Sequence, residues 1–190
     1  MVSSPQACTL CDGRADSPLC NHDKLRALIC EARQFSKFRP GQTIFHSGGH
    51  PMGIYVVTSG RVKLEALTDN GTALTLRLLG PGGVLGYRAL FAGEPSQASA
   101  IAVDEVQACF IPKGHLMQVL NEQPEAALRL IQYACKDLRI AEEKWIGQIN
   151  KDATARVAEA VLFLNDHFMN QYWTRREIAQ WAGTTPETVM

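Results

Sequence analysis

The hydrophobic and polar positions in the first two thirds of the chain follow a short, interrupted pattern. From residue 35 to residue 112, apolar runs of a few residues are separated by glycine and serine turns. The alternating run 61–67 ends near Asn70-Gly71, a pair that tolerates the positive φ angles of a tight hairpin. Many short strands at regular spacing with glycine turns predict an antiparallel barrel or sandwich. A short helix is predicted before these strands, over residues 23–33.

A helical period begins at Pro124 and continues to Asn150, with only Gly147 as an interruption. Apolar residues recur there at spacings of 3, 4, 3 and 4, which is the a/d pattern of a helix that packs against another helix. These residues are Ile131, Ala134, Leu138, Ala141 and Trp145. A helix of about 25 residues is near 38 Å long, which is more than a cap on a barrel requires. We expect self-association through this seam, and packing on the helix's own domain is the alternative.

The remaining residues predict a helix-turn-helix. Residues 153–168 have an amphipathic pattern, and the tetrapeptide 174–177 is a capping-box start for a helix over 175–182. Gly183 then supplies the turn, and Thr185-Pro186 opens a second helix with a threonine cap and a proline at the first helical position.

The second helix of such a motif enters the major groove with its N-terminal residues toward the base edges. We therefore predict DNA contacts from Thr174, Arg175, Thr185, Pro186, Glu187 and Thr188. Glu187 could accept a hydrogen bond from a cytosine amino group, and Thr185 could contact a phosphate. An ordinary helical hairpin is the alternative interpretation of this stretch.

Charge and hydropathy narrow the class of protein. Hydrophobic residues make up 46% and charged residues 20% of the 190 positions, which is typical of a globular protein. No apolar run is long enough to span a bilayer and the start does not resemble a signal peptide, so we expect a cytoplasmic protein with no membrane partner. The net charge is zero, whereas nucleic-acid binders usually have a basic surplus. Because the sequence stops at Met190, one turn into the second helix, we expect that further phosphate-binding residues would follow.

Signatures of catalysis are missing from the sequence. It contains no Gly-x-Ser-x-Gly, no glycine-rich phosphate loop with a lysine, and no His-Glu-x-x-His. We do not expect an enzyme. Six cysteines are many for a reducing compartment, where stable disulfides are unusual and clustered cysteines indicate a metal, a cluster or a redox switch.

Four stretches together resemble the Crp/Fnr family of transcriptional regulators. They are residues 38–45, 53–63, 81–86 and 174–190, and the resemblance covers about residues 20–190. It implies an α+β fold in which an antiparallel β-barrel, a jelly roll like the cyclic-nucleotide-binding domain, is followed by a long dimerisation helix and a truncated helix-turn-helix domain. The implied domains are a cysteine-bearing N-terminal segment (1–22), a sensor barrel (23–118), a dimerisation helix (119–150) and a DNA-binding domain (151–190).

The resemblance also implies a function. A homodimer would bind a palindromic promoter site and contact RNA polymerase, as an activator, and a signal in the barrel would shift the population of DNA-binding states. The alternative is a cyclic-nucleotide-like or metal/redox-sensing module without DNA binding. The capped stretch Thr174–Val189 favours the regulator.

The resemblance argues against cyclic AMP as the effector. The family's nucleotide-binding members carry a glutamate just after the glycine that starts the binding cassette, and an arginine–serine pair shortly afterwards. In this chain Val84 follows Gly83, residues 94–100 contain no arginine, and Arg88 falls in a different register. A phosphate without a bidentate partner would be poorly held.

The cysteines imply another cofactor. In the oxygen-sensing branch of the family, three N-terminal cysteines and one in the strand before an Ile-Pro step hold a 4Fe–4S cluster. Cys8, Cys11, Cys20 and Cys109 resemble that set and bring the chain nearer the cysteine-containing Fnr-like branch, although the gap between Cys11 and Cys20 is longer than usual. A zinc site or a thiol switch on the same thiolates stays open, as does a Cys109 that is only a small buried residue. A haem sensor would need an axial ligand, which His46 or His50 could supply.

Overall fold

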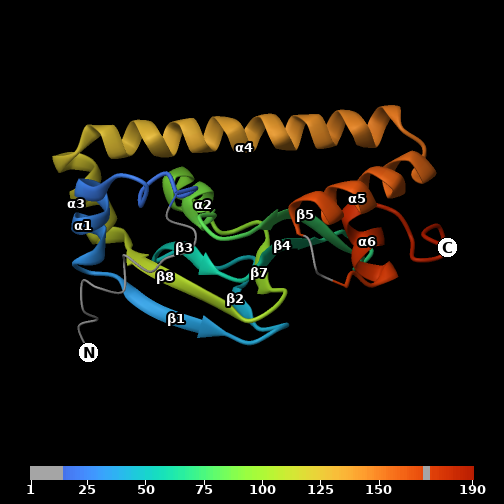
Figure 1. Ribbon diagram of the computed structural model, residues 1–190, viewed down its shortest axis with the longest axis horizontal. Coiled ribbons are helices and arrows are strands. Elements are labelled where there is room, and N and C mark those ends of the chain that lie inside the picture. Colours follow the sequence, from blue (N-terminus) through green and yellow to red (C-terminus); the bar gives the residue numbers. More distant parts are fainter. Residues whose placement is uncertain (1–14, 169–171) are drawn as a thin grey trace. The chain divides into compact units, whose positions relative to one another are not determined.

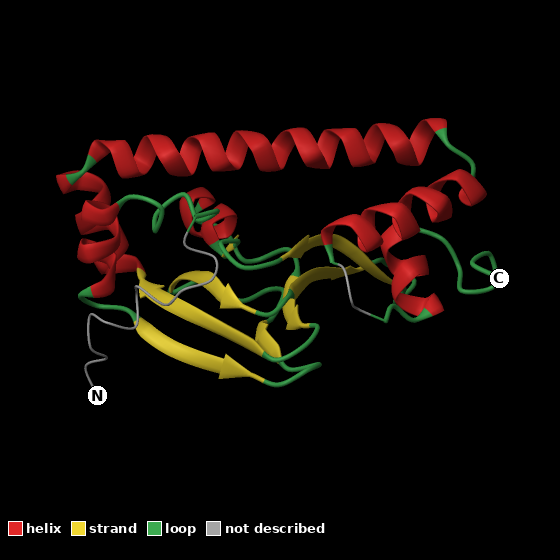
Figure 2. Ribbon diagram, viewed as in Figure 1, coloured by secondary structure: helices red, strands yellow, loops and turns green. Residues whose placement is uncertain are grey.

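The computed structural model describes residues 15–168 and 172–190 (Figure 1). In chain order its elements are α1 (Asp23–Cys30), β1 (Gln34–Phe38), β2 (Thr43–Phe45), β3 (Gly53–Ser59), β4 (Val62–Leu67), β5 (Ala73–Leu79), β6 (Val84–Leu85), α2 (Tyr87–Ala92), β7 (Ser99–Ala102), β8 (Val106–Pro112), α3 (Lys113–Glu122), α4 (Pro124–Asn150), α5 (Ala153–His167) and α6 (Arg175–Ala182). The described strands lie between residues 34 and 112, and α4, α5 and α6 follow them; helices and strands are distinguished by colour in Figure 2.

Two compact units emerge from the backbone contacts. The first contains the chain up to Leu64 together with Arg77–Cys135, and the second contains Glu65–Leu76 together with Lys136–Met190. Helix α4 is continuous and contributes its first half to the first unit and its second half to the second.

Two four-stranded sheets build the barrel-like part, with strand orders β1-β8-β3-β6 and β2-β7-β4-β5. Strand β8 lies between β1 and β3 and pairs antiparallel with both (Figure 1). Apolar side chains from both sheets meet in one buried cluster, made of Val57, Val62, Leu79, Leu85, Ala100, Ala102, Val106 and Ala108. The predicted α+β fold of antiparallel sheets followed by helices is therefore confirmed.

The corner between β3 and β4 depends on Gly60. Its φ is +78°, and a Cβ placed there would lie 2.2 Å from the carbonyl oxygen of Glu105, so only glycine fits. The next residue, Arg61, donates from its backbone amide and from Nε to the carboxylate of Asp104, at 2.6 and 2.8 Å. This pair joins the β3–β4 corner to the loop between β7 and β8.

A second cluster of buried apolar side chains packs the helices of the first unit against its strands. It includes Leu25 and Ile29 of α1, Leu116 of α3 and Leu130 of α4, all nearly or fully buried. Helices α1 and α3 lie side by side (Figure 1). Truncation of a side chain as enclosed as Leu116 costs about 2–5 kcal/mol of stability.

The bounds of the later helices agree with the sequence pattern, whereas α1 is shorter than predicted and α2 and α3 were not predicted. Helices α4 and α6 occupy the predicted residues 124–150 and 175–182, and α5 ends one residue before the predicted limit. Helix α1 stops at Cys30, three residues early, because Gln34 already pairs with Phe110 in the sheet. Helix α3 was not predicted; it ends at Glu122 because a residue before proline disfavours the helical region, and Pro124 then begins α4.

Candidate DNA-contacting, effector and dimerisation sites

The start of α6 has the predicted capping box. Thr174 Oγ1 accepts a hydrogen bond from the Glu177 amide at 3.2 Å, and the Glu177 carboxylate accepts one from the Thr174 amide at 2.8 Å. Two amides that lack partners inside the helix are thereby satisfied. Thr174 and Arg175 are both exposed at this helix start.

The turn after α6 is built on Gly183, whose φ of +64° is the left-handed conformation that glycine adopts without strain. Ala179 and Ala182 are buried on the inner face of α6, and their small side chains allow close packing there. This geometry matches the first helix and the turn of a helix-turn-helix.

The predicted second helix is not a regular helix here. Amides 188, 189 and 190 bond to carbonyls three residues earlier, so that residues 186–189 form successive turns. So few residues offer at most two i→i+4 bonds, which do not offset the cost of starting an α-helix. Thr185, Pro186, Glu187 and Thr188 are all exposed.

Glu187 is prepared to act as a hydrogen-bond acceptor. A backbone hydrogen bond, followed by one from the Thr185 side chain, lowers the pKa of its carboxyl, and the group is fully exposed. An ionised carboxylate can accept a hydrogen bond from a cytosine amino group.

Two residues that the sequence pattern did not single out hold the end of α6. Gln148 Nε2 and Arg156 Nε each donate to the carbonyl oxygen of Ala182 at 3.1 Å. Arg156 also reaches the Gly183 carbonyl at 3.4 Å. Their partners lie 34 and 26 residues away in sequence, so no local signal marks them.

The interior of the barrel is apolar and aromatic. Tyr55 is half-buried at the edge of the apolar cluster between the two sheets, with the rings of Phe38, Phe45 and Phe110 at centroid distances of 6.3, 6.3 and 4.9 Å. Burial raises the pKa of the Tyr55 hydroxyl. This surrounding suits an apolar filling and offers little to a sugar phosphate.

The cassette that would hold a cyclic nucleotide lacks its polar groups. Val84 is fully buried in β6, and its amide donates to the Tyr133 hydroxyl of α4 at 3.0 Å. Gly86 begins α2, and the residue after it is the buried Tyr87. Neither Gly83 nor Gly86 is followed by a carboxylate, and Arg88 is exposed. The residues present do not fit a cyclic nucleotide.

The candidate cluster ligands are only partly described. Cys8 and Cys11 lie outside the described residues. Cys20 is buried in the helical core, and burial raises the pKa of its thiol. Cys109 is buried in β8, opposite Phe35 and Val56. Within residues 15–168 and 172–190, no group of three or more His, Cys, Asp and Glu side chains could hold a metal ion.

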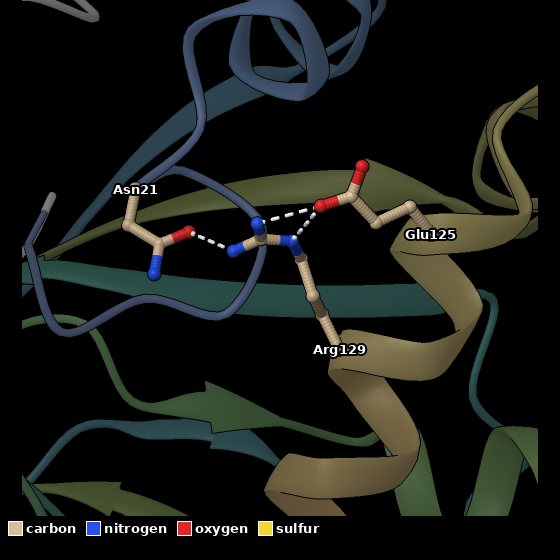
Figure 3. A network of polar contacts seen from close by, with 3 residues as sticks. All are labelled: Asn21, Glu125 and Arg129. Carbon is tan, nitrogen blue, oxygen red and sulfur yellow. Dashed lines mark hydrogen bonds and ion pairs between the residues drawn. The ribbon is translucent and has the colours of Figure 1, made fainter.

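Asn21, next to Cys20, is hydrogen-bonded to helix α4. Arg129 of α4 donates from Nη1 to Asn21 Oδ1 at 3.0 Å and from Nη2 to Glu125 Oε1 at 2.7 Å (Figure 3). Asn21, the residue after Cys20, is thus hydrogen-bonded to a residue near the start of α4.

The predicted seam lies along α4. Ile131, Leu138 and Trp145 are 59, 58 and 67% exposed, although they are large and apolar. Ala141 is exposed, and Ala134 packs partly against the core of the first unit. His46 and His50, the possible haem ligands, are exposed and follow the end of β2.

No helix in the described part of the chain combines the length and apolar character that a membrane crossing requires.

Comparison with known proteins identifies the class. Residues 35–123 match the model of the cyclic nucleotide-binding domain. The chain is 29% identical over 172 residues to a CRP-like cAMP-activated global transcriptional regulator of Mycobacterium tuberculosis, covering 86% of this chain and 77% of that protein. It is 31% identical over 151 residues to the cyclic AMP receptor protein of Thermus thermophilus, covering 78% and 70%.

A solved structure of a CRP/FNR-family transcriptional regulator from Thermus thermophilus superposes with a TM-score of 0.69 at 30% identity, covering 82% of this chain and 81% of that one. The fold and these matches define a domain of cyclic-nucleotide-binding type followed by helices. The chain belongs to the Crp/Fnr family of transcriptional regulators. The Mycobacterium tuberculosis relative and the solved Thermus thermophilus structure are both named as transcriptional regulators.

Proposed function

We propose that this protein is a DNA-binding transcriptional regulator that acts as a homodimer and receives its signal in the N-terminal barrel. The observation that carries the proposal is the capped helix α6 and the left-handed Gly183 turn, followed by four exposed residues, Thr185 to Thr188. In a helix-turn-helix, the residues that follow the turn face the base edges of the major groove. The exposure of these four residues directly after the turn supports this interpretation over that of an ordinary helical hairpin.

Each candidate residue has a definite role in this proposal. Thr174 and Arg175, at the start of α6, contact phosphates and set the register of the protein on the duplex. Thr185 contacts a phosphate at the groove edge, and Glu187 accepts from a cytosine amino group. Pro186 and Thr188 approach the neighbouring bases. RNA polymerase is the partner expected for a promoter-bound activator.

The partner of α4 in this proposal is a second copy of the chain. Large apolar residues recur along the helix at heptad spacing and are exposed, as Leu138 and Trp145 illustrate. Monomeric soluble proteins rarely leave a long apolar stripe in water. Full burial of each such side chain stabilises a dimer by about 1.5–3 kcal/mol. Two α4 helices, each 27 residues and about 40 Å long, would give the stalk of a homodimer.

Signal transfer begins at two contacts between the barrel side and α4. The first is the hydrogen bond from the Val84 amide to Tyr133, and the second is the Asn21–Arg129 contact (Figure 3). A change near β6 or near Cys20 would favour one packing of α4 over another. The equilibrium between DNA-binding and non-binding states would then shift, which needs a free-energy difference of only a few kcal/mol.

The nature of the signal is a narrower proposal. Several relatives are named for activation by cAMP, but the apolar residues after Gly83 and Gly86 and the lack of arginine in residues 94–100 speak against that ligand here. We propose instead a 4Fe–4S cluster on Cys8, Cys11, Cys20 and Cys109. Of these, Cys20 and Cys109 are buried thiols of the right chemistry, since soft thiolates suit iron–sulfur clusters. The cluster, when bound, would supply redox and oxygen sensitivity. A zinc ion or a thiol switch on the same residues is the second candidate.

The test of the DNA-binding proposal is footprinting of the full chain on chromosomal DNA in cells. The matched control is the double variant T185A/E187A, which keeps α6 and its cap intact. The expected result is protection at discrete promoter sites with the native protein, and loss of that protection with the variant. Equal protection patterns for both, or none for either, would refute the proposed reading residues.

A further inference from the structure

Lys144 lies between two segments of the second unit that are distant in sequence. It belongs to the later half of α4, and its Nζ donates a hydrogen bond to the carbonyl oxygen of Thr75 in β5 at 2.7 Å. The same Nζ lies 3.7 Å from the centroid of the Trp181 ring in α6. One ammonium group therefore contacts both the β4–β5 hairpin and the first helix of the helix-turn-helix.

The Trp181 ring is fixed on its other side. It stacks on Phe163 of α5 with a centroid distance of 4.8 Å and an angle of 12° between the rings. Phe163 in turn stacks on His167 at 4.3 Å. The Trp181 ring therefore contacts both an aromatic ring and the Lys144 ammonium group, and the ring face attracts the cation.

Gln148 and Arg156 hold the same end of α6, through the carbonyl oxygen of Ala182. Gly183 lies against the flexible end of the Gln148 side chain, and its φ of +64° is the conformation that favours glycine. The contacts to Trp181 and Ala182 come two residues and one residue before the turn. They therefore fix the angle at which the chain leaves α6 toward Thr185.

The chemistry of Lys144 sets it apart from the residues that merely pack. Its side chain is partly buried, and within the described chain it forms no ion pair. Partial burial removes water from the ammonium group, and this desolvation costs free energy. A methionine of similar length has no charge and does not incur that cost. The favourable interactions of the Lys144 charge are those with the Thr75 carbonyl oxygen and the Trp181 ring.

We propose that Lys144 is a positioning residue, which couples the place of the β4–β5 hairpin to the angle of α6 and hence to the placement of the DNA-contacting residues. The coupling rests on the proposed DNA-binding function. When the hairpin shifts, the Thr75 carbonyl moves relative to Nζ, and the ammonium group follows it or loses that bond. Either change alters the contact with Trp181, two residues before the Gly183 turn.

The test is a double-mutant cycle on the full chain, read by fluorine NMR of protein that carries 5-fluorotryptophan. The Trp181 signal is assigned with W181F. Gly71→Ala perturbs the hairpin tip: the φ of Gly71 is +78° and its Cβ would meet no atom within 4 Å, so the change strains only the hairpin backbone. K144M removes the cation, K144R restores it, and K136M is the control at an exposed lysine of the same helix.

We expect G71A to move the Trp181 signal in the native and K136M backgrounds, but not in K144M, and K144R to recover the response. A response of equal size in K144M would overturn the proposal. If K144M does not fold, K144Q takes its place in the cycle, because it removes the charge and keeps a donor.

DNA affinity is the second measurement. K144M should weaken binding to a selected site by about tenfold, and K144R should stay within about threefold of the native protein. Unchanged affinity in a folded K144M would also overturn the proposal. If the native protein binds no DNA at all, the proposed function fails, whereas the fluorine cycle still decides whether hairpin and α6 are coupled.

Discussion

The hydroxyl oxygen of Tyr133 accepts a hydrogen bond of 3.0 Å from the backbone amide of Val84. Val84 belongs to strand β6, and Tyr133 belongs to the long helix α4. The Tyr133 ring also meets the Tyr87 ring edge-on, with 5.6 Å between centroids. Strand β6 and the start of α2 are therefore joined directly to α4.

Replacement of Tyr133 by phenylalanine tests the strength of this link. The ring and its contact with Tyr87 are kept, but the buried Val84 amide loses its partner, which costs about 1–3 kcal/mol. We expect Y133F to lower the urea midpoint of unfolding accordingly. Y172F is the control, because Tyr172 is 98% exposed. Equal midpoints for Y133F and the native protein would show that the link contributes nothing.

The seam on α4 predicts the oligomeric state. The native chain should be a dimer by light scattering, and L138E should be a monomer at the same concentration, because a charge at the seam cannot be buried without a partner. A loss of about 3 kcal/mol corresponds to an increase in the dissociation constant of roughly 100-fold. M52E changes an apolar residue that is more exposed than Leu138 and lies far from α4 in sequence, and this variant should stay dimeric. A native monomer would contradict the dimer proposal.

Lys144 predicts a pH dependence of stability. Burial lowers the pKa of its ammonium group to about 8, whereas an unfolded lysine titrates near ~10.4. Between these pH values the unfolded chain binds more protons, so the free energy of unfolding rises with pH across this window; below it, both states are protonated and no gain is present. From about pH 7.5 to about pH 9.5 the native protein should gain on the order of 1 kcal/mol relative to K144M. Parallel curves for the two proteins would exclude this titration.

The cysteine proposal predicts a colour. Anaerobic purification of the full chain should give a brown protein that contains iron and bleaches in air. C20S and C109S should each be colourless, and C135S, at an exposed cysteine outside the proposed set, should stay brown. Colourless anaerobic native protein without iron would reject the cluster and leave the fold and the family unaffected. Zinc in that colourless protein would support the second candidate.

Local signals explain which parts of the fold the sequence predicts. The bounds of α6 follow from the Thr174 cap and Gly183, and the start of α4 follows from Pro124; each feature acts within a few residues. The strands before residue 112 follow from alternation and from turn residues such as Gly71. The second helix after Thr185 was expected from the same kind of signal, but too few residues follow it to sustain helical bonds.

Long-range contacts explain what the sequence does not predict. Tyr133 meets its partner across 49 residues and Lys144 across 69, so neither has a neighbour in sequence that marks it. In the sequence, nothing distinguishes Arg156 from other helical arginines; its role depends on the packing of α6 beside α5. The roles proposed for Cys20 and Cys109 depend likewise on residues far along the chain, and they stay predictions.

DNA reading by the residues after α6 is tested most directly by selection from randomised duplex DNA with the full chain. Two inverted half-sites with centres about 10 base pairs apart, or a multiple of that spacing, should be enriched, because a twofold dimer presents its two reading segments one helical turn apart. E187A should relax the preference at one base pair of each half-site, at a cost of about 1–3 kcal/mol in discrimination. Enrichment of no sequence, or of single half-sites without twofold symmetry, would contradict a dimeric regulator that reads DNA through this segment.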